Sequence, residues 1–220
     1  MNTKRVVAVI GASGEMGSAI AKSLAKGNYR SLLHSSKKNK VRFLIDEIKG
    51  GNSGADIEIV DDCMEVCWEA DIIILAIPYT VEKEVAENIR KVVNQKVVIS
   101  ISNPINDTRT QLIAASDTSA AEELQKKLPF AKVVKAFNTT FAGDFYNPTI
   151  NGQQVDCFIA GNDKEAIQVV YDLVKTAGFN PVIAGDLSVS RTLESIQLLL
   201  IQLATHNNYK SIARWKVLHN

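Results

Sequence analysis

The sequence has few cysteines and no long apolar run. Its three cysteines, Cys63, Cys67 and Cys157, are odd in number and include no Cys-x-x-Cys pair, which argues against a disulfide framework and against a zinc site. We expect reduced, partly buried thiols, as in a cytosolic protein. No stretch approaches the roughly 18 apolar residues of a membrane-spanning helix. The sequence therefore predicts neither a metal site nor a membrane protein.

A secretion signal, a charge of one sign and a histidine motif are also lacking. Residues Met1–Ile10 have neither the apolar region nor the cleavage site of a signal peptide, which favours the cytoplasm. The net charge is only +1, so we expect no binding to nucleic acid or to a membrane surface. No catalytic residue is predicted, because no motif with Asp, Ser or Cys includes the three histidines, His34, His206 and His219.

What the sequence does contain is a regular alternation of two patterns. Short β-branched runs predict strands, and longer amphipathic runs predict helices. The expected strands are 6–10, 31–34, 57–60, 72–76, 97–101, 132–136, 155–160 and 182–184. The expected helices are 14–26, 41–48, 64–68, 81–93, 119–128, 164–177 and 188–207, with a flexible turn at 50–54. This order predicts an α/β fold of the Rossmann type: a doubly wound, mainly parallel sheet with helices on both faces and a C-terminal helical extension.

A glycine-rich loop follows the first expected strand and opens the first helix. Gly11, Gly14 and Gly17 have the spacing of a dinucleotide fingerprint in its required strand–helix context. Gly11 allows a tight turn, Gly14 lets the backbone approach a pyrophosphate, and Gly17 lets the helix pack close to the sheet. Free N–H groups at the start of the helix then bind the anion. The loop predicts dinucleotide binding; the alternative is a glycine-rich turn without a ligand.

The segment after the second expected strand lacks a carboxylate. NAD-binding proteins usually have an acidic residue about 20 residues past the glycine loop, on the ribose 2′-OH. Here no Asp or Glu occurs from Met16 to Ile45. Hydroxyl and ammonium groups, which suit a 2′-phosphate, are supplied instead by Ser35, Ser36, Lys37, Lys38 and Lys40. NADP(H) is therefore favoured over NAD(H). The alternative is a solvated basic loop, which is how we interpret the other charges of this stretch, Lys22, Lys26, Arg30 and Arg42.

Three further loops follow expected strands, at the edge where open α/β sheets bind ligands. They predict the rest of a cofactor site, although each could be a simple turn. The candidate residues are Ala76, Ile77 and Pro78 in the first loop, Asn103 and Pro104 in the second, and Asn138, Thr139 and Ala142 in the third. Phe137 and Phe141 of the third loop line the pocket or are ordinary core residues.

No linker divides the chain, so we expect one NAD(P)-binding domain over residues 1–220. Residues 1–147 would form the dinucleotide-binding core, and residues 148–220 would add strands and the C-terminal helix. The apolar segment Ile196–Ile201 of that helix is either part of the core or the surface of a homodimer.

Together these motifs resemble the family of NADPH-dependent coenzyme F420 reductases, the F420-dependent NADP oxidoreductases. The resemblance runs from Val6 to Leu218. Besides the glycine loop, the matching stretches are 74–78, 98–104, 119–124, 133–139, 184–187, 191–194 and 215–218. The same module resembles the cytosolic reductase domain of the eukaryotic membrane metalloreductases.

The resemblance implies roles for individual residues. Ser13, Gly14, Glu15 and Met16 would hold the pyrophosphate, and Ser35, Ser36 and Lys40 the 2′-phosphate. Ile77, Asn103 and Ala142 would line the ribose and nicotinamide, and Leu187 would approach the ring. Two positions depart from the family's pattern. Ser36 stands where the family commonly has an arginine, whose bidentate phosphate contact is lost. Asn138 stands where deazaflavin-using members tend to have a histidine.

The expected function is hydride transfer between NADP(H) and a small-molecule acceptor, either a deazaflavin such as coenzyme F420 or a flavin. Such transfer requires that the protein hold two flat rings about 3–3.5 Å apart and exclude water, but requires no protein nucleophile. A non-enzymatic NADP(H) sensor is the alternative. An imine or β-hydroxyacid reductase is not expected, because about 33 residues from Ser188 onward are too few for the large helical domain of those enzymes.

Overall fold

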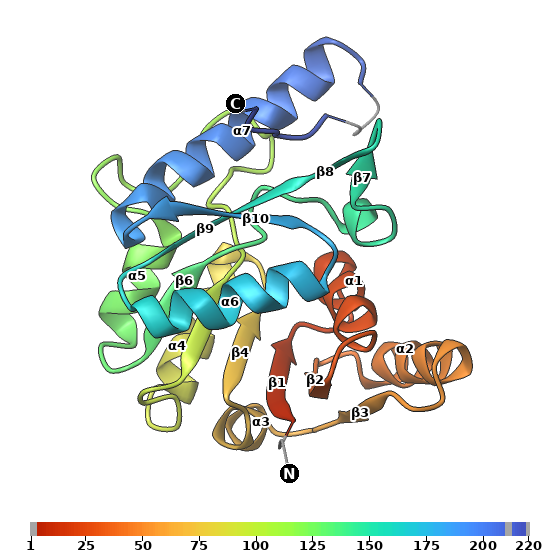
Figure 1. The fold of residues 1–220 in the computed structure, drawn as a ribbon. Coiled ribbons are helices and arrows are strands. Elements are labelled where there is room, and N and C mark those ends of the chain that lie inside the picture. The colour runs from red at the N-terminus through yellow and green to blue at the C-terminus, as the bar shows by residue number, and fades with distance from the viewer. Residues whose placement is uncertain (1–3, 210–212, 219–220) are drawn as a thin grey trace.

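The computed structural model describes residues 4–209 and 213–218. An eight-stranded sheet in the order β10-β9-β6-β5-β4-β1-β2-β3 forms its centre (Figure 1). All neighbouring strands in this sheet are parallel except β6 and β9. The predicted Rossmann-type, mainly parallel sheet is confirmed. The strands are β1 (Arg5–Ile10), β2 (Tyr29–His34), β3 (Asp56–Ile59), β4 (Ile72–Leu75), β5 (Val97–Ser100), β6 (Lys132–Lys135), β9 (Asp156–Gly161) and β10 (Asn180–Gly185).

Helices cover both faces of this sheet and bury one apolar cluster on each (Figure 1). On one face α1 (Glu15–Leu24), α2 (Lys38–Gly51) and α6 (Lys164–Thr176) supply the cluster. On the other face α3 (Cys63–Glu69), α4 (Tyr79–Ile89) and α5 (Ala120–Lys127) supply it. Because helices cover both sides, the central strand β4 is apolar along its whole length, with all four residues at most 1% exposed.

Local sequence explains where several of these helices begin. Asp62 and Asp163 each accept a backbone N–H of the first turn of α3 and α6 with their side chains. Ser119 does the same for α5, where its hydroxyl accepts the N–H of Glu122 at 3.2 Å and donates to the Glu122 carboxylate at 2.8 Å. The Ser–Glu spacing at this helix therefore predicted its start correctly.

Three local features differ from the expectations. Helix α2 continues through Gly50 and Gly51, where a flexible turn was expected, and ends with the Asn52 N–H bonded to Ile48. A short hairpin, β7 (Thr149–Ile150) and β8 (Gln153–Gln154), follows a 3₁₀ turn, η1 (Ala142–Phe145), and was not predicted because each strand is only two residues long. A second 3₁₀ turn, η2 (Leu187–Val189), delays the start of α7 (Ser190–His206).

The last helix, α7, is amphipathic in the structure. Leu193 and Leu200 are 3% exposed, whereas Leu199 and Leu203 are 45% and 39% exposed. The apolar run at Ile196–Ile201 is thus divided between the core and the surface. Among the residues that the structure describes, no helix is long and apolar enough to cross a membrane. The three cysteines are free thiols, and His219 lies outside the described residues.

Candidate functional site

The glycine loop between β1 and α1 has a backbone conformation that requires glycine. Gly11 has a φ of +90°, and a Cβ atom there would lie 2.2 Å from the carbonyl oxygen of Ala76 in the loop after β4. The N–H groups of Gly11 and Ala12 donate to the carbonyl oxygen of His34, at 2.9 and 3.1 Å. The loop is therefore held against the ends of both neighbouring strands, β4 and β2.

The other two glycines of the loop differ from each other. A Cβ atom at Gly17 would lie 2.3 Å from the carbonyl oxygen of Gly11, so α1 can approach the loop only with glycine there. A Cβ atom at Gly14 would meet nothing closer than the same oxygen, at 3.4 Å. Gly14 is exposed, and the protein's own packing does not require its lack of a side chain.

The amino ends of the helices fall into two groups. Side chains cap α3, α5 and α6, whereas α1, α2, α4 and α7 begin at Gly14, Lys37, Pro78 and Val189 with no side-chain cap. The helices α1, α2 and α4 start from the loops predicted to bind the cofactor. Their first backbone N–H groups carry the partial positive charge of the helix, which favours an anion.

The serines predicted at the phosphates lie together. The hydroxyls of Ser13, in the glycine loop, and Ser35, after β2, are 2.6 Å apart. Ser35 also accepts the backbone N–H of Lys37 at 3.2 Å. Ser35 is buried by these contacts, whereas Ser36, Lys37, Lys38 and Lys40 are exposed around it. The structure thus brings the two predicted phosphate loops into one continuous surface.

Two of the four basic residues that we expected to be only solvated form ion pairs with carboxylates. Lys22 bonds Glu47 at 2.6 Å, and Arg30 bonds Glu58 at 2.6 Å and also contacts Glu69. The expectation of simple solvation is therefore wrong for these two, because carboxylates from α2, β3 and α3 lie beside them. Lys26 and Arg42 are exposed.

Asn103 and Asn138 join the loops after β5 and β6. The Asn103 amide donates to the backbone oxygen of Asn138 at 2.8 Å. The Asn138 amide donates to Asn103 Oδ1 at 3.0 Å and to the backbone oxygen of Leu193 at 3.1 Å. Since both of its neighbours are acceptors, the Asn138 NH₂ must face them, and its Oδ1 points elsewhere. That oxygen is buried and has no hydrogen-bond partner within the described residues.

The loop after β6 begins with a strained residue. Phe137 has a φ of +59°, which is uncommon for a residue with a side chain. Its ring is fully buried and packs against Phe145 and Phe179 at centroid distances of 5.6 and 6.2 Å. Phe137 is therefore a core residue that anchors the loop, and the backbone turn at this position directs Asn138 toward Asn103.

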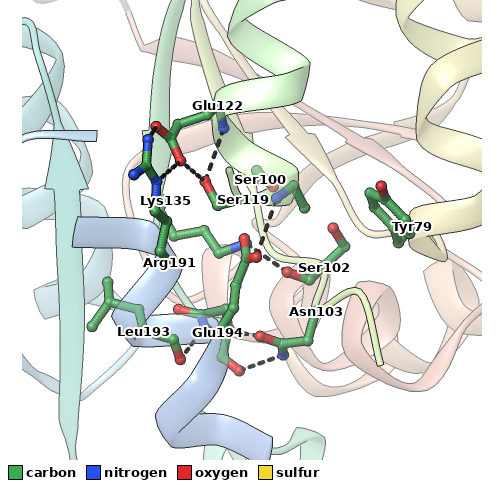
Figure 2. A network of polar contacts seen from close by, with 12 residues as sticks. Tyr79, Ser100, Ser102, Asn103, Ser119, Glu122, Lys135, Arg191, Leu193 and Glu194 are labelled. Carbon is green, nitrogen blue, oxygen red and sulfur yellow. Dashed lines mark hydrogen bonds and ion pairs between the residues drawn. The ribbon is translucent and has the colours of Figure 1, made fainter. Parts of the chain in front are cut away.

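A buried ion pair, absent from the predictions, lies beneath these amides. Lys135 at the end of β6 is 0% exposed and bonds Glu194 of α7 and the backbone oxygen of Ser102, each at 2.6 Å (Figure 2). The second Glu194 oxygen accepts the N–H of Ala120 at 3.1 Å. The pair connects α7 to β5, β6 and α5 directly beside Asn103. A lysine directly after two valines, at the end of a strand expected in the middle of the sheet, is the sequence signal that could have revealed it.

Glu82 of α4 is buried next to this pair. The Ser100 hydroxyl donates to it at 3.4 Å, and Lys135 and Glu194 are close enough to influence it. Burial raises the pKa of Glu82 to about 7, against the opposing effect of Lys135. Glu82 therefore keeps its proton to a higher pH than an exposed glutamate would.

The remaining predicted residues are distributed between loop and core. Ile77 and Ala142 are half-buried, and each packs against one of the two apolar clusters. Thr139 is buried, and its hydroxyl has no partner in the part of the chain that the structure describes. Leu187 is 3% exposed and packs in the cluster under α3, α4 and α5, so its approach to a ring stays a prediction.

A glycine loop, uncapped helix ends and a basic loop at the carboxyl edge of this sheet are the features of a Rossmann-type dinucleotide-binding domain. The family model for coenzyme F420-dependent NADP oxidoreductases matches residues 6–104. The F420-dependent NADP reductase of Methanocaldococcus jannaschii is 33% identical over 218 residues, covering 93% of this chain and 94% of that protein. The chain belongs to the F420-dependent NADP reductase family.

A solved structure and a partial relative are also similar to this chain. The structure of a candidate F420-dependent NADP reductase from Arthrobacter sp. FB24 superimposes with a TM-score of 0.83 at 21% identity, covering 97% of this chain and 99% of that one. This shows the same fold over almost the whole length. The metalloreductase STEAP3 of Rattus norvegicus is 34% identical over 107 residues, which are 48% of this chain and 21% of that protein.

Proposed function

We propose that this protein transfers a hydride between NADPH and a deazaflavin of the coenzyme F420 type. The observation that carries the proposal is the set of loops at the carboxyl edge of the sheet. There the basic loop after β2 contacts the glycine loop through Ser13 and Ser35, and the Asn103–Asn138 pair joins the loops after β5 and β6. Full-length similarity to a reductase named for F420 and NADP supports the choice of both redox partners.

The residues present fit an NADP(H) molecule. Gly14 leaves an open approach to the uncapped start of α1, where the backbone N–H groups of Glu15, Met16 and Gly17 would hold the pyrophosphate. Ser35, Ser36 and the lysines would bind the 2′-phosphate. The unpartnered Oδ1 of Asn138 is a buried acceptor that suits an amide N–H, because a buried acceptor without a partner is costly. Loops containing Ala76–Pro78, Asn103–Pro104 and Thr139–Ala142 would enclose the nicotinamide.

In this proposal NADPH supplies the hydride and the deazaflavin accepts it. The protein's part is binding and orientation. The paired amides of Asn103 and Asn138 hold the two loops at a set separation, and the ion pair of Lys135 and Glu194 holds α7 over them. Buried residues such as Phe137 and Pro104 exclude water from this edge. No protein nucleophile is required.

Stopped-flow mixing of the protein with NADPH and coenzyme F420 tests the proposal. We expect nicotinamide oxidation and deazaflavin reduction in equal amounts, with rates that saturate in both partners. Hydride transfer to a flavin but not to F420 would show that the acceptor is a flavin and not a deazaflavin. Tight NADPH binding without transfer to either acceptor would contradict the enzyme and favour a sensor of the NADP(H) state.

Replacing Lys37, Lys38 and Lys40 together with Ala is expected to weaken NADPH binding by about tenfold to a hundredfold while changing NADH binding little, because only NADPH carries the 2′-phosphate. Fluorescence titration with both dinucleotides measures the effect. The matched control removes three exposed lysines elsewhere, Lys49, Lys83 and Lys91, for the same change in net charge. Equal losses for NADPH and NADH would show that the cluster is only a solvated surface.

We also propose that residues 1–220 form one domain, that the protein is cytoplasmic, and that it forms a homodimer. Hydrogen bonding of β9 to β6 in the same sheet supports a single domain. The solubility of both proposed substrates supports the compartment. The exposed apolar side chains of Leu199 and Leu203 on α7 support a contact between two copies of the chain. A monomer in sedimentation velocity would contradict the dimer.

A further inference from the structure

The three lysines of the basic loop are not equivalent. Lys38 Nζ lies 2.8 Å from Asp61 Oδ2. Within residues 4–209 and 213–218, neither Lys37 nor Lys40 has a carboxylate at ion-pair distance, so their charges stay available to a ligand. One of the three charges expected at the 2′-phosphate is thus already neutralised by a group of the protein itself.

Asp61 lies in the loop after the predicted strand at 57–60 and is not among the predicted site residues. It follows β3, which pairs with β2, and the Val60 N–H bonds the Leu33 oxygen at 3.0 Å. The Val60 oxygen in turn contacts His34 Nδ1 at 3.1 Å. Asp61 therefore lies at the same edge as the loop after β2. A carboxylate, absent from the sequence after β2, is thus present nearby in the loop after the neighbouring strand β3.

Three basic side chains act on the carboxylate of Asp61. Lys38 acts most strongly, and Arg42 and His34 add to it; together they hold the pKa of Asp61 below its usual range. The group is a carboxylate throughout the neutral range. Its side chain is 61% exposed and that of Lys38 is 48% exposed, so no packing prevents either from reorienting toward a ligand.

We propose that Asp61 is a specificity-determining residue that competes with the 2′-phosphate of NADP(H) for Lys38 and thereby limits the preference for NADP(H) over NAD(H). The inference rests on the proposed function, because it requires a bound dinucleotide. A phosphate near Lys38 must share the Lys38 ammonium with Asp61 or displace it, and also lies close to a second negative charge. NAD(H), with a hydroxyl in place of the phosphate, meets neither cost.

The test measures dissociation constants for NADPH and NADH by fluorescence titration, at low salt and at 0.5 M salt. Asp61→Asn is expected to tighten NADPH by about threefold to tenfold at low salt and to change NADH less than about twofold. The gain should shrink at high salt, since exposed charges are screened. The matched control is Asp56→Asn, which removes an ion-paired carboxylate at the opposite end of β3 and should leave both constants unchanged.

The double variant Lys38→Ala/Asp61→Asn tests the route through Lys38. Lys38→Ala alone should weaken NADPH only slightly, whereas the same change in the Asp61→Asn background should remove most of the gain. An equally large effect of Lys38→Ala in both backgrounds would contradict competition for this lysine.

Two results would overturn the inference outright. Weaker NADPH binding in Asp61→Asn would show that Asp61 orients Lys38 toward the phosphate. Equal changes for NADPH and NADH would show that Asp61 acts elsewhere on the dinucleotide. Failure of the proposed function is seen separately. A protein that binds NADPH but transfers no hydride refutes the reaction, and the NADPH and NADH affinities of Asp61→Asn still test the role of Asp61. A protein that binds neither dinucleotide refutes both.

Discussion

Replacing Lys135 with Met is expected to lower the free energy of unfolding by about 3–5 kcal/mol, because it leaves the buried Glu194 carboxylate without its cation. Lys135 is 0% exposed and the Glu194 side chain 1% exposed, so water cannot take over the lost interaction. The backbone oxygen of Ser102 would lose its 2.6 Å bond to Lys135 as well. Urea unfolding followed by circular dichroism measures the change.

A double variant separates the unpaired charge from the lost packing. Lys135→Met/Glu194→Met removes both charges and is expected to be more stable than Lys135→Met alone, because replacing a whole buried pair by apolar groups is often nearly neutral. Some loss should remain, since the Ala120 N–H and the Ser102 oxygen lose their partners. A double variant less stable than the single one would contradict this account.

Lys132→Met is the matched control for the same substitution on the same strand. Lys132 is paired with Asp163 at 3.1 Å and with Glu165 at 3.4 Å, but these side chains are accessible to solvent. Exposed ion pairs contribute little to stability. The urea midpoint of Lys132→Met should therefore stay close to that of the unmodified protein. A loss as large as that of Lys135→Met would show that burial is not the cause.

Gly11→Ala is expected to destabilise the fold by about 3 kcal/mol or more. A positive φ costs a residue with a side chain roughly 1–3 kcal/mol, and overpacking against a fixed neighbour costs roughly another 1–3 kcal/mol. That neighbour is the carbonyl oxygen of Ala76, 2.2 Å from the added Cβ atom, and it is backbone that cannot rotate away. Thermal unfolding of the unliganded protein measures the effect without reference to any ligand.

Gly14→Ala, three residues along the same loop, should behave in the opposite way. The added Cβ atom has space, with its nearest atom at 3.4 Å, so the melting temperature should change little. NADPH and NADH binding should each weaken by about tenfold, because the methyl group would stand between the start of α1 and the pyrophosphate. Unchanged affinity for both dinucleotides would show that the pyrophosphate does not lie against Gly14.

Predictions from the sequence were most successful where the signal was local. The alternation of apolar runs located all eight strands of the main sheet, and the Ser119–Glu122 spacing located the start of α5. They failed at Gly50 and Gly51, where the hydrogen bonds of α2 outweigh the weak helix preference of glycine. They also missed β7 and β8, because two residues are too few to show a period.

For the candidate site, the sequence located the loops but not their partners. The glycine loop and the serines after β2 were identified from spacing, and the structure joins them through Ser13 and Ser35. The pairing of Asn103 with Asn138, 35 residues apart, had no signal in the sequence. The same is true of Lys38 with Asp61, where the relevant carboxylate comes from the loop after the adjacent strand β3.

By itself, the sequence determined the order of strands and helices, the glycine-dependent turn at Gly11 and the absence of acidic residues after β2, because each depends on residues close together in the chain. Only the tertiary structure decided the antiparallel pairing of β6 with β9, the burial of Lys135 against Glu194 and the position of Asp61 beside Lys38. These contacts join residues that are 23 or more positions apart. They form only when whole elements pack together, and a charge or a strand edge alone does not specify which distant residue it will meet.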